Sequence, residues 1–312
     1  MKRVKFIFKK TKLNSLFIVS LILLLFFCGG YFAIPVSFSA DAIDVNEIDG
    51  RDNMDFGDID ENDKVGLVLS GGAAWGLAHV GVLEVIEEAG INVDMISGTS
   101  AGAIVGALYA DGYSPSQLKE LVSELGWTDF IFPSINSRGF FSSLRVEENL
   151  DELLESEDIS DLEVFFNIAV TDMDKGELIE YSSGPLAKLL SASAAVPVMF
   201  SPVEYEDKLL ADGGLIDNLP QNALRKAGAD VIIAVDVAGN FSFTGRAEGM
   251  IEYGNRAFNI MRRTMQDVSG ADILIQPELD GYSGIDFNNY VEIIEKGREA
   301  AMIHFEPAEK DN

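Results

Sequence analysis

Residues 65–102 read VGLVLSGGAAWGLAHVGVLEVIEEAGINVDMISGTSAG and contain two short apolar runs, each followed by a glycine-containing turn. The run from Val65 to Leu69 has the length and composition of a buried strand. The stretch from Leu77 to Ala89 places apolar side chains on one face of a helix, and Gly90 is a typical helix stop. A second strand is expected at 94–97. The order of strand, helix and strand predicts a βαβ unit in a mostly parallel sheet.

The same alternation continues along the chain. The uncharged stretch from Gly102 to Ala110 predicts a helix buried against the sheet, because Gly102 and Gly106 lie one turn apart on its surface. Ser114 and Pro115 are the cap and first-turn residues of another helix. Further strands are expected at 164–170, 208–211, 231–235 and 273–275, and further helices at 186–192, 221–227, 250–265 and 290–305. The sequence therefore predicts one α/β domain at 64–305, followed by a tail at 306–312.

The first 42 residues do not fit that domain. Basic residues precede an uncharged run from Leu13 to Ala40, namely Lys2, Arg3, Lys5, Lys9, Lys10 and Lys12. This order is typical of an export signal. Ala40-Asp41-Ala42 has the small-x-small form of a cleavage site, whereas Leu16–Ile34 is close to the length that spans a bilayer. Residues 1–42 are expected to be a signal peptide or a retained membrane anchor, which places the protein in the cell envelope.

Residues 43–63 are rich in Asp and Glu and carry Arg51 as their one basic residue. Such a segment lacks the apolar density to pack, so it is expected to be a solvated tether. The acidic residues do not have the spacing of a calcium loop that ends in a bidentate Glu. The tether is therefore the favoured interpretation.

Composition excludes several classes of function. Of 312 residues, 51 are Asp or Glu and 23 are Lys or Arg, which leaves a formal charge of -28 and argues against a nucleic-acid partner. The single cysteine, Cys28, rules out a disulfide framework and a cysteine-rich zinc site, and nothing in the sequence suggests a metal or another cofactor. Without residues 1–42 the balance is 17 basic against 50 acidic residues, or -33. A protein so acidic would be repelled by an anionic surface unless it were tethered or high ambient salt screened its charge, which favours the anchor.

Gly98-Thr99-Ser100-Ala101-Gly102 is a G-x-S-x-G sequence between a predicted strand and a predicted buried helix. In such a turn the serine has a strained backbone, and the flanking glycines allow neighbouring segments to approach closely. Ser100 would lie at a helix N-terminus, where free amides favour developing negative charge. We interpret Ser100 as a nucleophile.

The turn at 71–76 reads GGAAWG and has two possible functions. It could bind a phosphate at the start of the next helix or supply backbone amides to an oxyanion. Ala73 replaces the middle glycine of a dinucleotide-binding fingerprint, and the chain continues directly into the serine turn. An oxyanion loop is therefore favoured.

A serine nucleophile needs a base, and the chain has two histidines, His79 and His304. His79 lies early in the predicted helix after the glycine turn and is interpreted as structural or solvating. His304 follows Ser100 and Asp212 in the chain order of a Ser-Asp-His triad, but no glycine turn presents it. Asp212 comes at a strand end, before Gly213 and Gly214, and is the favoured base.

Three segments together resemble the signature blocks of bacterial patatin-like phospholipases. They are Leu69–His79, Gly98–Gly102 and Asp212–Gly214, and Ser191–Pro197 and Ala271–Pro277 are similar to that family as well. The resemblance covers residues 64–305. It implies a patatin-like three-layer α/β sandwich with a mostly parallel central sheet and a serine elbow. It also implies a Ser-Asp dyad without histidine that hydrolyses lipid esters, typically phospholipids, at a membrane surface.

The resemblance also assigns roles to residues. It implies that Ser100 is the nucleophile, that Asp212 is the general base and that the amides of Gly71, Gly72 and Ala73 form the oxyanion hole. The remaining motif glycines are Gly76, Gly98, Gly102, Gly213 and Gly214.

Two positions of the glycine loop depart from the family's pattern. Ala73 stands where the glycine run continues, and it would strain the loop by about 1 kcal/mol if position 73 needs a positive φ. Trp75 replaces the usual Arg or Lys, which puts the preference for a lipid headgroup in doubt. A triad esterase that uses His304 and a non-catalytic lipid-binding protein are the alternatives. Acyl chain, headgroup and protein partners are not specified by the sequence; aromatic residues of Gly126–Arg145 are equally consistent with an acyl-chain contact and with the core.

Overall fold

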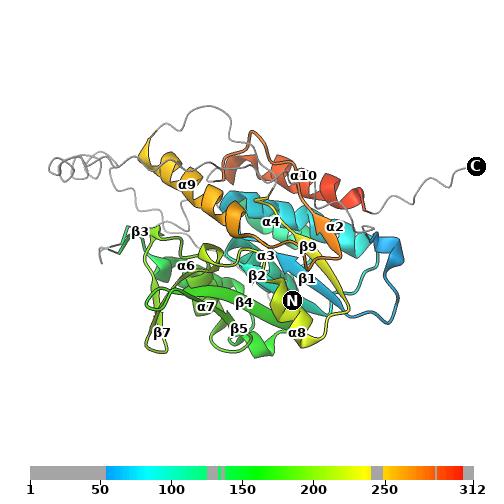
Figure 1. The fold of residues 1–312 in the computed structure, drawn as a ribbon, viewed down its shortest axis with the longest axis horizontal. Helices are drawn as coiled ribbons and strands as arrows, with labels where there is room; N and C mark the ends of the chain where they lie inside the picture. The colour runs from blue at the N-terminus through cyan, green and yellow to red at the C-terminus, as the bar shows by residue number, and fades with distance from the viewer. Residues whose placement is uncertain (1–53, 125–132, 135–137, 240–248, 285–286, 305–312) are drawn as a thin grey trace, which may run out of the picture. The chain divides into compact units, whose positions relative to one another are not determined.

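The computed structural model describes residues 54–124, 133–134, 138–239, 249–284 and 287–304 (Figure 1). The predicted signal or anchor at 1–42 lies outside these residues, as do most of the tether, the tail at 306–312 and Trp127, Phe130 and Phe132. Across the described ranges, no helix combines the length and apolarity needed to cross a bilayer.

An eight-stranded sheet forms the centre of the fold, in the order β10-β9-β1-β2-β4-β8-β7, with β5 paired to β4. The strands are β1 (Val65–Leu69), β2 (Met95–Thr99), β4 (Phe165–Asp172), β5 (Glu177–Tyr181), β7 (Val203–Tyr205), β8 (Lys208–Asp212), β9 (Val231–Val235) and β10 (Ile273–Ile275). The run from β10 to β4 is parallel, whereas β5, β8 and β7 join by antiparallel pairing. The prediction of a mostly parallel sheet is confirmed for this central run.

Helices cover both faces of the sheet, as Figure 1 shows, so the fold has three layers. The α-helices are α2 (Ala78–Glu88), α3 (Ala101–Ala110), α4 (Pro115–Glu124), α6 (Ser143–Leu153), α7 (Leu186–Ser193), α8 (Gln221–Ala227), α9 (Met250–Met265) and α10 (Tyr290–Met302). Side chains alternate between the two faces of β1. Leu67 and Leu69 belong to the larger core with α2, α3 and α10, and Val68 belongs to a smaller core with α8. The predicted three-layer α/β fold is therefore present.

Several elements were not predicted, and they share short length or a half-exposed position. They are β5, β7, α6, the two-stranded sheet of β3 (Gly139–Phe141) and β6 (Val198–Phe200), and the short 3-10 helices η2 (Phe56–Asp58), η3 (Ala73–Leu77), η4 (Ile159–Asp161), η5 (Gly213–Leu215) and η6 (Phe287–Asn289). Helix α10 ends at Met302, before the predicted Phe305. In the Gly126–Arg145 segment, Phe141 packs against Phe200, whereas Phe140 is exposed.

The folded part begins before the predicted boundary at Lys64. Phe56 is buried, its amide donates to the carbonyl of His304, and its ring lies 6.2 Å from the imidazole. Met54 and Ile59 pack against the same core. The last part of the predicted tether is therefore attached to the domain, because its few apolar side chains reach a core formed by distant residues, whereas most of its polar side chains are exposed.

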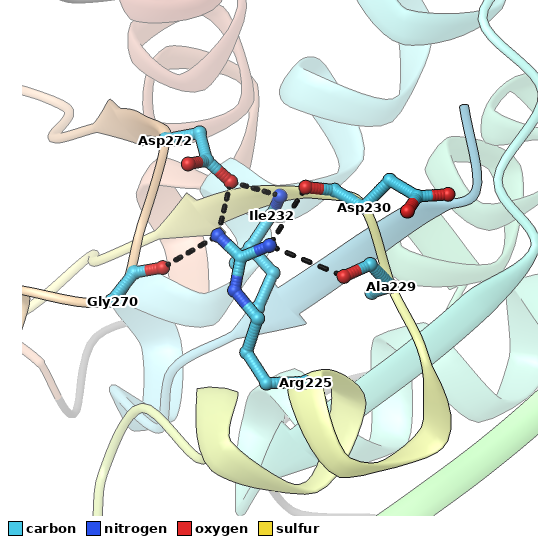
Figure 2. Close-up of polar contacts among 6 residues, drawn as sticks. All are labelled: Arg225, Ala229, Asp230, Ile232, Gly270 and Asp272. Carbon is cyan, nitrogen blue, oxygen red and sulfur yellow. Dashed lines mark hydrogen bonds and ion pairs between the residues drawn. The ribbon is translucent and has the colours of Figure 1, made fainter.

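Arg225 joins the end of α8 to the strands β9 and β10 (Figure 2). Its guanidinium donates to the carbonyls of Ala229, Asp230 and Gly270 and to the carboxylate of Asp272, which also accepts from the amide of Ile232. One side chain thus satisfies backbone carbonyls that would otherwise lack a donor at this end of the sheet.

We expect Arg225→Met to lower the free energy of unfolding by about 2 kcal/mol, because several hydrogen bonds to a charged group are lost together. The neighbouring Lys226 is the matched control, since its ion pair with Glu180 is 3.6 Å long and its side chain is 76% exposed. Lys226→Met should change stability by less than about 1 kcal/mol. Urea denaturation followed by circular dichroism measures both, and equal effects would contradict the role of the Arg225 contacts.

Candidate active site

Ser100 occupies the turn between β2 and α3 with a strained backbone, φ 53° and ψ -125°. The flanking glycines make this turn possible. A Cβ atom on Gly98 would lie 2.6 Å from Cα of Ala103, and one on Gly102 would lie 2.3 Å from the carbonyl oxygen of Leu69. Real Cβ atoms do not approach other heavy atoms this closely, so neither position can carry a side chain without a shift of the backbone. The predicted elbow is confirmed as a local structure, and Gly102 brings α3 onto the end of β1.

The backbone of Ser100 is held by Ser193, which belongs to the segment Ser191–Pro197 but was assigned no function from the sequence. The amide of Ser100 donates to Oγ of Ser193 at 2.8 Å, and that hydroxyl donates to the carbonyl of Ala169 at 2.7 Å. Ser193 lies in α7 and Ala169 in β4, so the turn is tied to both neighbouring elements. These bonds offset part of the strain at Ser100.

Asp212 is the last residue of β8, and its carboxylate lies close enough to the Ser100 side chain for that hydroxyl to lower the pKa of Asp212. The same carboxylate accepts from the amide of Gly214 at 2.8 Å. Gly213 starts the η5 turn beside β4, where a Cβ atom would lie 2.4 Å from the carbonyl oxygen of Ala169. The structure thus brings Ser100 and Asp212 together.

Burial sets the proton affinity of Asp212. Loss of water around this carboxyl raises its pKa to about 6, although the hydrogen bonds from Ser100 and Gly214 and the charge of Arg262 oppose the increase. A carboxylate with this pKa is ionised at neutral pH and accepts a proton more readily than an exposed one. The chemistry available here is proton abstraction from a serine hydroxyl.

The glycine loop runs beside Ser100 but does not present three free amides. The amide of Gly71 donates to Oδ1 of Asn218 at 3.2 Å, and Nδ2 of Asn218 donates back to the Gly71 carbonyl at 3.1 Å. Within the part of the chain that the structure describes, no acceptor binds the amides of Gly72 and Ala73. The inclusion of Gly71 among the oxyanion donors therefore needs correction, because a distant asparagine already uses that amide.

Ala73 has the positive φ that was considered from the sequence. Its φ is 48°, so alanine takes a conformation that glycine would adopt at lower cost. The neighbouring Gly72 has no room for a side chain, since a Cβ atom there would lie 2.5 Å from Cγ2 of Val237. Gly76 packs against α3, with 2.5 Å between its hypothetical Cβ and that of Ala101. The loop is thus held closely at both ends.

The other unusual residues of this segment are structural. Trp75 is buried, and its indole donates to the carbonyl of Tyr282 at 2.9 Å, so it holds the loop that precedes α10. His79 is fully buried, and its Nε2 contacts the Ser70 carbonyl at 2.8 Å. Burial lowers the pKa of His79 to about 4. The interpretation of His79 as structural fits its place, and it is not solvated.

Nothing in the sequence indicated Arg262 of α9, a buried charged residue near Asp212. It is 6% exposed, and its charge acts on both Asp212 and Asp236. One nitrogen donates to Oδ1 of Asn259 at 2.7 Å, and another lies 3.5 Å from Oδ1 of Asn218. Asn218 thus links Arg262 to the glycine loop. The sequence signal that could have indicated Asn218 is its position shortly after Asp212.

An apolar cavity of about 190 Å³ begins at Ser100 and Ala73. Among the described residues that line it, Ser100 is the one with a polar side chain. The remaining wall comes mainly from α2, α3, α4 and α6, including Val80, Ile104, Val105, Leu118, Val146 and Leu150. The cavity can hold a hydrocarbon chain with its reacting end at Ser100.

His304 lies elsewhere. It lines a separate cavity with Leu274 and Glu299, and its Nδ1 is 3.9 Å from a carboxylate oxygen of Asp55. Burial lowers its pKa. The structure does not bring His304 to Ser100. Over the described segments, no group of three or more His, Cys, Asp or Glu side chains could hold a metal ion.

Comparisons with known proteins agree with the fold and the motifs. A family model described as patatin-like phospholipase matches residues 67–225. Lysophospholipase nte1 of Aspergillus fumigatus is 30% identical over 269 residues, which cover 75% of this chain and 18% of that protein. An uncharacterized NTE family protein of Mycobacterium tuberculosis is 30% identical over 184 residues, which cover 57% of this chain and 50% of that protein. VipD of Legionella pneumophila has a similar fold, with a TM-score of 0.56 and 15% identity over 78% of this chain and 66% of that one. The chain thus spans less than one fifth of the fungal relative and half of the mycobacterial one.

Proposed function

Because this chain belongs to the patatin-like phospholipase family, we propose that it is a serine acyl hydrolase that releases a fatty acid from a lipid ester. The observation that carries the proposal is that the Ser100 hydroxyl, at the wall of an apolar cavity, lies beside the buried carboxylate of Asp212. A hydroxyl beside a base suits nucleophilic attack, and an apolar wall suits the hydrocarbon part of an acyl group.

In the first half of the proposed reaction, Oγ of Ser100 attacks the ester carbonyl while Asp212 accepts the hydroxyl proton. The carbonyl oxygen becomes an oxyanion. In this proposal the amides of Gly72 and Ala73 and the N-terminus of α3 stabilise it. Collapse of the intermediate breaks the ester C–O bond, Asp212 returns its proton to the leaving alcohol, and the acyl group remains on Ser100.

In the second half, Asp212 accepts a proton from water, which attacks the acyl-enzyme. The second tetrahedral intermediate releases the fatty acid, and the proton on Asp212 returns to Oγ of Ser100. No histidine takes part. The buried position of Asp212 supports a mechanism without histidine, because a carboxylate in a dry site is a stronger base than an exposed one.

The relatives suggest a phospholipid or lysophospholipid substrate. The fungal relative is named a lysophospholipase, and the apolar cavity at Ser100 is compatible with an acyl chain at the reacting position. Trp75 does not replace the family's basic residue as a headgroup contact, because its indole is buried against Tyr282. We also retain as a proposal that residues 1–42 export the protein or anchor it in the cytoplasmic membrane.

An alkyl fluorophosphonate tests the proposed function, because it modifies an activated serine at its Oγ. We expect mass spectrometry to find the label on Ser100, with faster labelling as the alkyl group lengthens and fills the apolar cavity. Ser100→Ala should not be labelled, and His304→Ala should be labelled at the wild-type rate. Failure of the wild type to react would favour the non-catalytic lipid-binding protein, and loss of labelling in His304→Ala would favour the triad.

A further inference from the structure

Asn218 is a buried polar residue that the proposed reaction does not itself use. It is 2% exposed and belongs to the loop that follows Asp212 and the η5 turn. Two motif glycines make room for its side chain. A Cβ atom on Gly71 would lie 2.7 Å from Oδ1 of Asn218, and one on Gly214 would lie 2.8 Å from the same oxygen. Asn218 therefore packs against both the glycine loop and the turn after the base.

The side chain of Asn218 bonds Gly71 from both ends of its amide group. Its Oδ1 accepts from the Gly71 amide at 3.2 Å, and its Nδ2 donates to the Gly71 carbonyl at 3.1 Å. The peptide between Gly71 and Gly72 is trans. In a planar trans peptide the carbonyl and the following N–H point in opposite directions. The bond to the Gly71 carbonyl therefore directs the amide of Gly72 away from Asn218.

The Gly72 amide is a buried donor without a partner. Gly72 is buried, and among the described residues no acceptor binds its amide. Buried backbone donors are normally paired, because an unpaired one costs free energy. The loop lies against the nucleophile at this point: a Cβ atom on Gly71 would lie 2.9 Å from Cβ of Ser100, and Ala73 lines the apolar cavity together with Ser100. The oxyanion of the proposed reaction is an acceptor for this amide.

Other groups fix the residue before the loop. Nε2 of His79 lies 2.8 Å from the Ser70 carbonyl, and because a carbonyl can only accept, this nitrogen is the donor. Oγ of Ser70 accepts from the amide of Val237 at 2.9 Å. The next peptide, between Gly71 and Gly72, depends on Asn218. Within the part of the chain that the structure describes, no other side chain bonds it.

Asn218 is itself held close to the nucleophile. The carbonyl of the preceding Asp217 accepts from Oγ1 of Thr99 at 3.1 Å, and Thr99 is the residue before Ser100. We propose that Asn218 is a positioning residue that directs the Gly72 amide toward the oxyanion and fixes its place relative to Ser100. The proposal rests on the proposed hydrolysis and adds to it the residue that orients the oxyanion donor.

The test compares two ligands that carry the same alkyl chain. Oγ of Ser100 adds to the carbonyl carbon of an alkyl trifluoromethyl ketone, its proton passes to Asp212, and the carbonyl oxygen becomes an oxyanion. The matching fatty alcohol enters the cavity without forming an oxyanion. The ratio of the two dissociation constants therefore measures oxyanion stabilisation separately from binding in the cavity. The full chain in detergent micelles is used, and kcat and KM for a p-nitrophenyl ester are measured in parallel.

Two substitutions of Asn218 are compared with one control. Asn218→Ala removes both bonds to Gly71, and Asn218→Asp keeps the acceptor for the Gly71 amide but loses the Nδ2 donor. Asn167→Ala is the matched control, because Asn167 is also 2% exposed and its Nδ2 bonds Oγ of Ser97 at 2.9 Å, in strand β2 rather than in the glycine loop. Circular dichroism and the thermal midpoint verify that each variant is folded.

We expect each Asn218 variant to bind the ketone about 10²-fold more weakly and to lose a similar factor in kcat, since a misdirected oxyanion donor acts like a lost one. Binding of the alcohol and KM should change little. Asn167→Ala should leave the ratio of the two dissociation constants unchanged. All measurements are made on the alkaline plateau of the pH profile, where Asp212 stays ionised even with the charge that Asn218→Asp adds.

Two results would overturn the proposal. One is a wild-type ratio in the folded Asn218 variants, and the other is equal weakening of ketone and alcohol, which indicates a structural role alone. If Asn218→Ala does not fold, Asn218→Asp decides, because it keeps the shape of the side chain. A wild-type protein that does not prefer the ketone to the alcohol would contradict the proposed hydrolysis and this inference with it, so the two failures are distinguishable.

Discussion

Replacing Asp212 with Asn is expected to lower kcat/KM for ester hydrolysis by about 10³-fold, within the range that general-base catalysis contributes. Asn keeps the shape of the side chain and still offers an oxygen to the amide of Gly214. It does not take up the Ser100 proton at any pH in use. The effect should therefore appear mainly in kcat rather than in binding of the lipid.

The pH profile of the wild type gives an independent measure of the same group. The pKa of Asp212 is raised to about 6, so the carboxyl loses its basic form as pH falls through that value. Activity should therefore be highest above about pH 6 and decrease tenfold for each lower unit once the group is protonated. In Asp212→Asn, the residual activity should lack this acidic limb.

Asp207→Asn is the matched control for this substitution. Asp207 comes directly before β8, the strand that ends at Asp212, but its side chain is exposed. Its φ of 58° is also tolerated by asparagine. Wild-type activity in Asp207→Asn and lost activity in Asp212→Asn would support the base. Wild-type activity in a folded Asp212→Asn protein would remove Asp212 from the mechanism.

Replacing Arg262 with Met is expected to have the second largest effect, on stability and on the pH profile together. Arg262 is buried and its charge acts on Asp212 and Asp236, so its removal leaves two buried carboxylates without this compensating charge. Among these described residues Arg262 forms no direct ion pair with either carboxylate, so we expect the loss of unfolding free energy to approach but not exceed about 3–5 kcal/mol, the cost of breaking a buried ion pair from one side. The charge of Arg262 also holds the pKa of Asp212 down, so its loss should move the acidic limb to higher pH.

Two comparisons separate this effect from general damage. Arg138→Met removes a cation whose ion pair with Glu204 is exposed, and it should cost less than about 1 kcal/mol and leave the pH profile unchanged. Arg262→Lys keeps a charge and should restore part of the wild-type acidic limb, although it loses the contacts to the two asparagines. Urea denaturation and kcat/KM between pH 5 and 9 measure these changes. An unaltered acidic limb in folded Arg262→Met would contradict the electrostatic role.

The sequence predicted those parts of the site that depend on neighbouring residues. The elbow at Ser100 requires glycines at 98 and 102, and the strand that ends at Asp212 is followed by two more glycines. The helix at 250–265 was also predicted with the correct bounds. The orientation of this helix was not predicted, because helical periodicity does not indicate which side of the helix faces the core and which faces solvent.

The contacts that the sequence did not predict join residues far apart in the chain. The Gly71 amide bonds Asn218 across 147 positions, and this bond removes it from the expected oxyanion donors. Phe56 packs near His304, so the domain begins earlier than its acidic composition suggested. No local pattern marks either partner, since the energy of such a contact depends on packing that forms after the chain has folded.

The positions of the strands, the helices and the serine elbow therefore followed from residues 65–102 and from similar short segments later in the chain. Backbone geometry and hydrophobic periodicity are properties of such short segments. The fold family and the proposed roles of Ser100 and Asp212 followed from short sequence motifs. Tertiary structure was needed to bring Asp212 to Ser100, to enclose both beside an apolar cavity and to direct Arg262 inward. Burial and long-range charge control the proton affinity of Asp212, and neither exists until distant segments have packed together.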